Sequence, residues 1–304
     1  MTFVGTLKNI AYIGLFILLV PLIPLTISGI QKLFNRYFEH RAHVAVLPIK
    51  GVLYNSGYYT KYLHQYFKDN QIKAIVLKIE SPGSASGTGQ AIYNEIISLK
   101  KEYPKPVIAL VENVCASGGY YIACGADHII ASPLAMIGSI GVAFPYFFKL
   151  KNFIEQFKIQ YVPLAAGTYK NSTNPFSELN ENEKAMLQEV LDDSYQQFLS
   201  DVATSRKLDE LELKEVGDGK IFNGRQALQL KLIDELGSSF QLIKAVKEKA
   251  HIATDIKWVH APSRTGFWSL FGDANDDKDQ SVFSSCINEV CAIIESRYAK
   301  QVMQ

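Results

Sequence analysis

We predict an α/β fold with a mainly parallel β-sheet, on three observations. Short apolar runs alternate with segments of helical periodicity, about one unit every 30 residues, which is the pattern of βαβ units. The runs are rich in the β-branched residues that favour strands, and a proline bounds the run at 106–111. Two loops rich in glycine and serine follow such runs, at the end of a parallel sheet where functional residues collect.

The N-terminal half of this pattern contains four strands and three helices. The strands are expected at 44–49, 74–79, 106–111 and 128–131. Two helices are expected at 60–69 and 88–101, because apolar side chains recur there at helical spacing: Leu63, Tyr66 and Phe67 in one, Ile92, Ile96 and Leu99 in the other. A short third helix is expected after Ser117.

A long helix is the clearest element of the C-terminal half. It begins near Asn180, with Glu183 as its capping-box partner. Its apolar stripe comprises Leu187, Val190, Leu191, Tyr195, Phe198 and Val202. Around it we expect a strand at 136–144, a helix at 149–157, a loop at 165–171, a helix at 225–232 and another ending near 250. Beyond 251 the pattern is weak, with an acidic loop at 272–280 and a helix at 282–298.

The N-terminal segment predicts a membrane anchor. Residues 10–30 carry no charged side chain, and as a helix these 21 residues would span about 31 Å, close to the hydrocarbon core of a bilayer. A cleavable signal peptide is the alternative, but the run is long for one and no Ala-x-Ala site follows it. Lys8 precedes the run, whereas Lys32, Arg36 and Arg41 follow it, so the charge count alone favours a cytoplasmic domain.

Charge and cysteine content limit the possible partners. The 31 Lys and Arg against 30 Asp and Glu give a net charge of +1, which offers no strongly basic face for nucleic acid. The four cysteines, Cys115, Cys124, Cys286 and Cys291, lack the spacing of a metal site. We therefore expect no metal and no cofactor.

The stretch at 113–121, Asn-Val-Cys-Ala-Ser-Gly-Gly-Tyr-Tyr, is the candidate nucleophilic site. A buried strand breaks there into small residues before a helix resumes, which leaves Ser117 at the helix N-terminus. Unpaired N–H groups and the helix dipole favour negative charge at such a position, and flanking glycines let a substrate backbone approach. A structural alternative is equally open at this point, in which Ser117 simply caps the helix.

A nucleophilic serine requires a base, and Lys170 is the candidate. The six histidines, His40, His43, His64, His128, His251 and His260, have no evident catalytic placement, which favours a serine–lysine pair. No carboxylate lies between Glu155 and Glu178, so no acid close in sequence would hold the Lys170 amine protonated. A surface lysine without function is the alternative.

Four separated segments resemble the signal peptide peptidase A family, membrane-bound serine–lysine peptidases of the Clp-protease/crotonase fold superfamily. They are Ser-Pro-Gly at 81–83, Ala-Ser-Gly-Gly-Tyr-Tyr at 116–121, Gly-Ser-Ile-Gly-Val at 138–142 and Gly-Thr-Tyr-Lys-Asn at 167–171. Val-Ala-Thr-Ser-Arg at 202–206 and Phe-Asn-Gly-Arg-Gln-Ala at 222–227 continue the match, which runs in order from about 44 to 249. The resemblance implies repeated ββα units behind one transmembrane helix.

The resemblance implies a role for each matching residue. Ser117 would be the nucleophile and Lys170 the general base, with Ser139 holding the lysine amine by a hydrogen bond. The backbone N–H groups of Gly83 and Gly118 would form the oxyanion hole. The sequence departs from the family at Ser84, where a second glycine is usual. If that position requires a positive φ, Ser84 would distort the hole.

The resemblance also implies the biological setting. The substrates would be released signal peptides and other unfolded apolar peptides, hydrolysed through an acyl-enzyme, with serine and lysine supplied by adjacent protomers of a ring-like homo-oligomer. The chain would be a single-pass protein of a bacterial-type plasma membrane with its catalytic domain outside the cytoplasm, against the charge count. We divide it into an anchor and connector (1–42), a peptidase domain (43–250) and a C-terminal extension (251–304).

Two other readings remain open from the sequence. The first is a membrane-anchored assembly or binding module that keeps the fold without turnover, a possibility that Ser84 raises. The second is a crotonase-type acyl-CoA enzyme, which shares the fold class and the oxyanion hole but explains neither the anchor nor the segment around Lys170.

Overall fold

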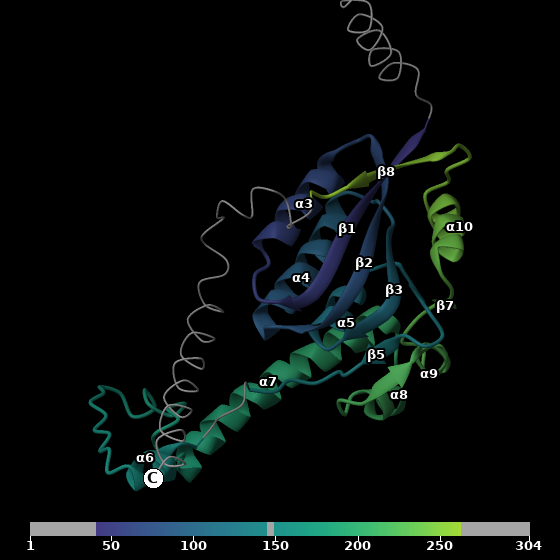
Figure 1. Ribbon diagram of the computed structural model, residues 1–304. Coiled ribbons are helices and arrows are strands. Elements are labelled where there is room, and N and C mark those ends of the chain that lie inside the picture. Colours follow the sequence, from purple (N-terminus) through teal and green to yellow (C-terminus); the bar gives the residue numbers. More distant parts are fainter. Residues whose placement is uncertain (1–40, 145–148, 263–304) are drawn as a thin grey trace, which may run out of the picture.

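A computed structural model describes residues 41–144 and 149–262 and shows a mixed α/β fold (Figure 1). One sheet has the strand order β6-β5-β3-β2-β1-β8, with β4 paired to β3 and β7 to β4. All pairings are parallel except β5 with β6. The strands are β1 (Ala42–Leu53), β2 (Ile72–Ser84), β3 (Val107–Ala116), β4 (His128–Ala131), β5 (Met136–Gly138), β6 (Ile221–Asn223), β7 (Glu235–Leu236) and β8 (Ile256–His260). The predicted mostly parallel sheet is confirmed.

Helices cover both faces of the central strands, which explains why these strands are almost continuously apolar. On one face, Leu47 and Leu77 pack with α3 (Gly57–Lys68), α4 (Ser86–Glu102) and α5 (Gly118–Ala123). On the other face, Val46 and Val76 pack with α10 (Ser239–Lys249). Successive side chains of a strand point to opposite faces, so β1 contributes to both layers.

Helix α7 (Glu181–Arg206) extends well beyond the sheet (Figure 1). Its C-terminal half packs beneath α5, where the rings of Phe198 and Tyr121 stack with centroids 4.3 Å apart. Its N-terminal half reaches α6 (Lys151–Gln156) and the loop that follows it. The N-cap Asn180 forms the predicted capping box with Glu183. The predicted apolar stripe is wrong at Val190, whose side chain is half exposed.

Three features of the chain differ from the sequence prediction. The predicted strand at 136–144 ends at Gly138, because Gly138 and Ser139 both adopt positive φ, of 104° and 52°, and turn the chain out of the sheet. Two short helices, α8 (Glu210–Val216) and α9 (Gly224–Gln229), frame the three-residue strand β6; α8 and β6 were not predicted. The sheet also continues past residue 250, our proposed domain end, because β8 pairs with β1.

Within residues 41–144 and 149–262, no helix combines the length and the apolar composition that a membrane span requires. The predicted anchor at 10–30 lies outside the described residues. The predicted acidic loop at 272–280 and helix at 282–298 also lie outside them.

Candidate active site

Ser117 occupies a sharp turn between the end of β3 and the start of α5. Its backbone has φ 50° and ψ −125°, a conformation that residues with a side chain rarely adopt. Two hydrogen bonds hold the turn: the Ser117 N–H donates to the Gly138 carbonyl at 2.8 Å, and the Tyr121 N–H donates to the Ser117 carbonyl at 2.9 Å. The strained turn is thus fixed from both sides and presents the hydroxyl at the sheet edge.

The turn lies against the end of β2, and glycine is favoured on both sides, at Gly83 by its positive φ and at Gly118 and Gly119 by close contacts. Gly83 has φ 155°, and a β-carbon there would lie 3.6 Å from Ser117 Oγ. A β-carbon on Gly118 would lie 1.9 Å from Ser84 Oγ, and one on Gly119 would lie 2.8 Å from the Ser81 carbonyl oxygen. These contacts bring Gly83, Ser117 and Gly118 together, as the resemblance implied.

The two predicted oxyanion donors differ in whether their backbone N–H already donates a hydrogen bond. Gly118 is the first residue of α5, where a backbone N–H has no acceptor within the helix. The Gly83 N–H donates to Ser81 Oγ across a long 3.3 Å. Ser81 is fully buried and its hydroxyl donates to the Gly51 carbonyl at 2.7 Å, which anchors the Gly83 loop to β1.

Ser84 fits the loop without backbone strain. Among the described residues, positive φ is found at six non-glycine positions, and Ser84 is not one of them. Its hydroxyl donates to the Ala85 carbonyl at 2.8 Å and lies in the space that a side chain on Gly89 or Gly118 would need. The φ condition under which Ser84 would distort the hole is therefore not met.

Ser139 shares a cavity of about 480 Å³ with Ser117. The Ser139 N–H donates to the Lys220 carbonyl at 2.7 Å. The amine of Lys220 is 2.7 Å from an Asp218 carboxylate oxygen, and this ion pair lowers the pKa of Asp218. Only the backbone of Lys220 contacts Ser139, and its amine pairs with Asp218.

Lys170 does not lie in either of the two cavities that Ser117 lines. It is exposed, in the loop between α6 and α7, and this loop is tied to the N-terminal end of α7 through a hydrogen bond from the Ser172 hydroxyl to Glu183. That end of α7 is the one distant from the sheet (Figure 1). A single chain therefore does not bring Lys170 to Ser117.

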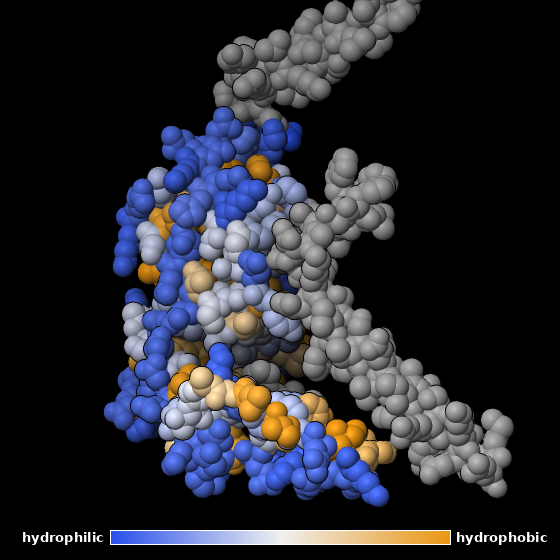
Figure 2. Space-filling model, turned by 90° about the vertical axis from the view of Figure 1, so that its left-hand side faces the viewer, coloured by the Kyte–Doolittle hydropathy of each residue, from blue (hydrophilic) through white to orange (hydrophobic). Residues whose placement is uncertain are grey.

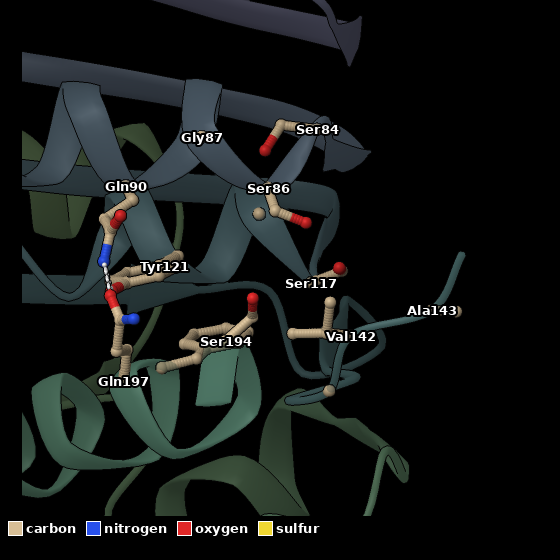
Figure 3. A pocket seen from close by; sticks show the side chains of 13 residues that line it. Ser84, Ser86, Gly87, Gln90, Ser117, Tyr121, Val142, Ala143, Ser194 and Gln197 are labelled. Carbon is tan, nitrogen blue, oxygen red and sulfur yellow. Dashed lines mark hydrogen bonds between the residues drawn. The ribbon is translucent and has the colours of Figure 1, made fainter. Parts of the chain in front are cut away.

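A second cavity, of about 380 Å³, adjoins the first and shares Ser117 and residues 141–143 with it; it lies between α4, α5 and α7 (Figure 3). Polar side chains line it: Ser84, Ser86, Gln90, Ser194 and Gln197. The Tyr121 hydroxyl donates to an Asp201 carboxylate oxygen, and burial together with this bond raises the pKa of Tyr121. The sequence did not predict a role for Gln90 and Gln197, because they are 107 positions apart and neither belongs to a recognisable motif in its own helix.

The other reactive side chains show structural roles. His64 pairs with Glu95 and His128 with Glu235, and neither histidine lines a cavity with Ser117. Burial raises the pKa of the Cys115 thiol well above its usual value and that of Cys124 to about 12, which keeps both thiols protonated. In the described ranges no three His, Cys, Asp or Glu side chains gather in a way that could hold a metal ion.

Comparisons with known proteins identify relatives. Residues 99–253 match the model of peptidase family S49. A putative protease of Synechocystis is 37% identical over 171 residues, which are 56% of this chain and 61% of that protein. A putative protease of Methanocaldococcus jannaschii is 29% identical over 71% of this chain and 68% of its own length. A putative signal peptide peptidase SppA of Enterococcus faecium is 28% identical over 80% of this chain and 77% of its own length.

Proposed function

Because the chain belongs to peptidase family S49 and shares this ancestry with proteins named as proteases, we propose that it is a serine endopeptidase with a Ser117–Lys170 dyad. The observation that carries the proposal is the Ser117 turn. A serine held at positive φ at the N-terminus of α5, with two glycines against it, is built for close approach of a peptide carbonyl.

The reaction would proceed through an acyl-enzyme. The neutral Lys170 amine accepts the Ser117 proton while Ser117 Oγ attacks the peptide carbonyl carbon. The protonated amine then gives this proton to the departing amine as the C–N bond breaks. Water, activated by the same lysine, attacks the ester, and the acid product leaves. Ser139, which shares a cavity with Ser117, would hold the lysine amine in place.

The oxyanion would be bound by the Gly118 and Gly83 N–H groups. Gly118 offers its N–H as the first residue of α5. Gly83 would exchange its 3.3 Å bond to Ser81 Oγ for the oxyanion, and this exchange is favourable because a charged acceptor forms a shorter and stronger bond than a hydroxyl. Each such donor typically contributes a factor of about 10² to 10³ in rate.

We propose that a second copy of the chain brings Lys170 to Ser117 in a ring-like homo-oligomer. The site is incomplete in one chain, and the arm formed by α6 and the loop after it exposes large apolar side chains: Phe153, Phe157, Ile159, Val162 and Leu164. Figure 2 shows an apolar band at the lower end of the molecule. Exposed apolar surface of this kind favours contact with another protein, and here a copy would supply the missing base.

We further propose that residues 1–42 anchor a peptidase domain at 43–250 on the outer side of a bacterial-type plasma membrane, with 251–304 as an extension that begins by adding β8 to the sheet of this domain. The anchor rests on the uncharged run at 10–30. The substrates would be released signal peptides and other unfolded apolar peptides in extended form. The support for this class is the relative from Enterococcus faecium that is named a putative signal peptide peptidase.

One observation favours a second candidate, a non-proteolytic membrane-anchored module. The exposed Lys170 is outside both cavities that Ser117 lines, so the fold could persist without a working dyad. The two candidates differ in whether any assembly of the chain cleaves a peptide.

The test uses the full chain in detergent with a quenched fluorescent apolar peptide. We expect cleavage that rises with pH, because only a neutral amine accepts the serine proton. Ser117→Ala and Lys170→Ala should each abolish cleavage, whereas Lys184→Ala, which removes another exposed lysine near the same arm, should retain it.

Mixing the two inactive variants before assembly tests the shared site. If serine and lysine come from different copies, roughly a quarter of the sites in a random mixture regain both groups, and activity returns. Full activity of Lys170→Ala would overturn the dyad. Absence of cleavage by the wild-type chain at every pH would favour the non-proteolytic module.

A further inference from the structure

The cavity between α4, α5 and α7 is lined by three hydrogen-bonded polar side chains, Gln197, Gln90 and Tyr121, and this chain of bonds ends on a carboxylate at each side (Figure 3). At one end, Gln197 Nε2 donates to Asp193 at 2.7 Å. At the other end, the Tyr121 hydroxyl donates to Asp201. Between them, Gln90 Nε2 donates to Gln197 Oε1 at 2.9 Å and to Tyr121 Oη at 3.3 Å.

The two carboxylates determine which way the Gln90 amide faces. An ionised carboxylate only accepts hydrogen bonds, so Gln197 must turn its NH₂ group to Asp193 and its oxygen to Gln90. For the same reason Tyr121 must donate to Asp201, and its oxygen is left as an acceptor for Gln90. Gln90 therefore uses both amide protons within the chain of bonds.

The Gln90 carbonyl oxygen is the group left over. Within the described residues this oxygen accepts no hydrogen bond. Every buried side-chain oxygen and nitrogen of these residues has a partner, so an oxygen without one must be accessible to solvent. Gln90 lines the cavity, and Figure 3 shows its oxygen on the side away from Gln197. The network thus leaves one free acceptor, the Gln90 oxygen, and one free donor, because Gln197 Nε2 uses only one of its two protons, for Asp193.

The charged groups around the cavity also favour an N–H donor over an anionic group. Asp193 and Asp201 stand directly behind the network, and neither forms an ion pair with the residues described. No lysine or arginine lines the cavity. An acidic group placed there would face an acceptor oxygen and two carboxylates, whereas an N–H donor would be stabilised by them.

The position beside Ser117 identifies which part of a peptide would enter. This step rests on the function proposed above. The cavity borders Gly118, a proposed oxyanion donor, whereas the adjoining cavity contains Ser139, beside which the lysine would protonate the leaving amine. The acyl part of the substrate, and with it the side chain of the residue before the cleaved bond, would therefore face Gln90.

We propose that this cavity is a specificity subsite that selects, at the residue before the cleaved bond, side chains with a terminal N–H donor, namely glutamine and lysine, and rejects glutamate. The acceptor that reads the donor is Gln90 Oε1, and Gln197 and Tyr121 hold it in that orientation. An apolar side chain of the same length, methionine, would enter but leave the Gln90 oxygen unpaired.

The test compares four peptides that differ only at this residue: glutamine, lysine, methionine and glutamate. We expect kcat/KM for glutamine to exceed that for methionine about tenfold and that for glutamate about a hundredfold or more, because glutamate brings a negative charge towards Asp193 and Asp201 and cannot donate to the Gln90 oxygen. In Gln90→Met the preference for glutamine over methionine should disappear. Gln196→Met, which removes the neighbouring exposed amide on α7, should leave all ratios unchanged. Ratios within one variant do not depend on how much of the enzyme is folded.

Binding of the same peptides to Ser117→Ala, followed by fluorescence anisotropy, separates this inference from the peptidase proposal. If the peptides bind with the same ranking but the wild-type chain cleaves none of them, the subsite proposal stands and the peptidase proposal is wrong. Cleavage with equal ratios for glutamine and methionine, or equal binding of glutamine and glutamate, would overturn the subsite.

Discussion

Gly83 and Ser117 are in van der Waals reach of each other: a β-carbon on Gly83 would lie 3.6 Å from the Ser117 hydroxyl oxygen and 3.4 Å from its β-carbon. In the proposed reaction the peptide carbonyl would occupy this space. The end of β2 thus borders the turn after β3, and the φ of 155° at Gly83 favours glycine there.

Gly83→Ala should therefore lower kcat/KM by about 10²-fold or more, because the new methyl group enters the space beside the nucleophile and disturbs an oxyanion donor. Peptide cleavage by the full chain measures this. Gly57→Ala is the control, since its new methyl group would meet only the end of the Asn55 side chain, at 3.1 Å. Unchanged kcat/KM in Gly83→Ala would contradict the assignment of this face to the substrate.

Gly118→Ala should destabilise the fold as well as the site. Its β-carbon would lie 1.9 Å from Ser84 Oγ and 2.8 Å from the Ser84 backbone nitrogen. Adding Ser84→Gly removes the first clash but not the second, so the double variant should recover only part of the lost stability. Urea unfolding of the single and double variants measures this. Complete recovery would show that the backbone at Ser84 moves freely, contrary to the packing described here.

Ser84→Gly alone should lower the free energy of unfolding by about 0.5 to 1 kcal/mol, because glycine adds freedom to the unfolded chain and Ser84 is not strained. A gain in stability in the same urea experiment would instead indicate that Ser84 is strained.

The central strands and the turn at Ser117 were predictable because their signals are local. β1 to β3 are long strands rich in β-branched residues, and the capping pair Asn180 and Glu183 marks the start of α7 in the sequence. The turn at Ser117 follows from a run of small residues between a strand and a helix. Each of these elements is determined mainly by residues next to it in the chain.

The missed elements depend on pairing across the chain. β6 and β7 have three and two residues, too few for any period, and they are strands only because β5 and β4 lie beside them. β8 is a strand because it adds to β1, more than 200 positions away. The cavity floor depends in the same way on Gln90 meeting Gln197, which no local pattern shows.

A largely buried ion pair ties the end of α7 to the sheet. The Arg206 guanidinium, only 8% exposed, bonds both carboxylate oxygens of Asp234, at 3.1 and 2.9 Å. Burial alone would raise the pKa of Asp234, but Arg206 reverses this and lowers it. Arg206→Met should lower the free energy of unfolding at neutral pH by about 3 kcal/mol, because it leaves a partly buried carboxylate without its partner.

The pH dependence of this loss follows from the lowered pKa. A carboxylate whose pKa is lower folded than unfolded stabilises the fold above its unfolded pKa, and this contribution disappears as the pH falls through the folded pKa, here below about 4. The difference between wild type and Arg206→Met in urea unfolding should thus narrow below about pH 4. Lys214→Met, which breaks an exposed pair with Glu210, should change stability little at either pH. A gap that is independent of pH would contradict this role of Asp234.

Glu183 should act as a positioning residue for Lys170. Its carboxylate accepts from the Asn180 N–H at 2.9 Å and from the Ser172 hydroxyl at 3.1 Å, and both Ser172 and Glu183 are largely buried. Ser172 lies two residues after Lys170, so these bonds fix the segment that carries the proposed base. Glu183→Ala removes both bonds, frees this segment and should lower kcat about tenfold while KM changes little. Peptide cleavage per folded molecule measures this.

Asp209→Ala is the matched control, because Asp209 and Glu212 form the same capping box at α8 without touching the segment around Lys170. Loss of either cap should lower stability by about 1 kcal/mol, but only Glu183→Ala should lower kcat. Equal kcat in the two variants would show that the Glu183 contacts serve the fold alone. A fall in kcat confined to Glu183→Ala would connect the buried contacts at the end of α7 to the proposed reaction at Ser117.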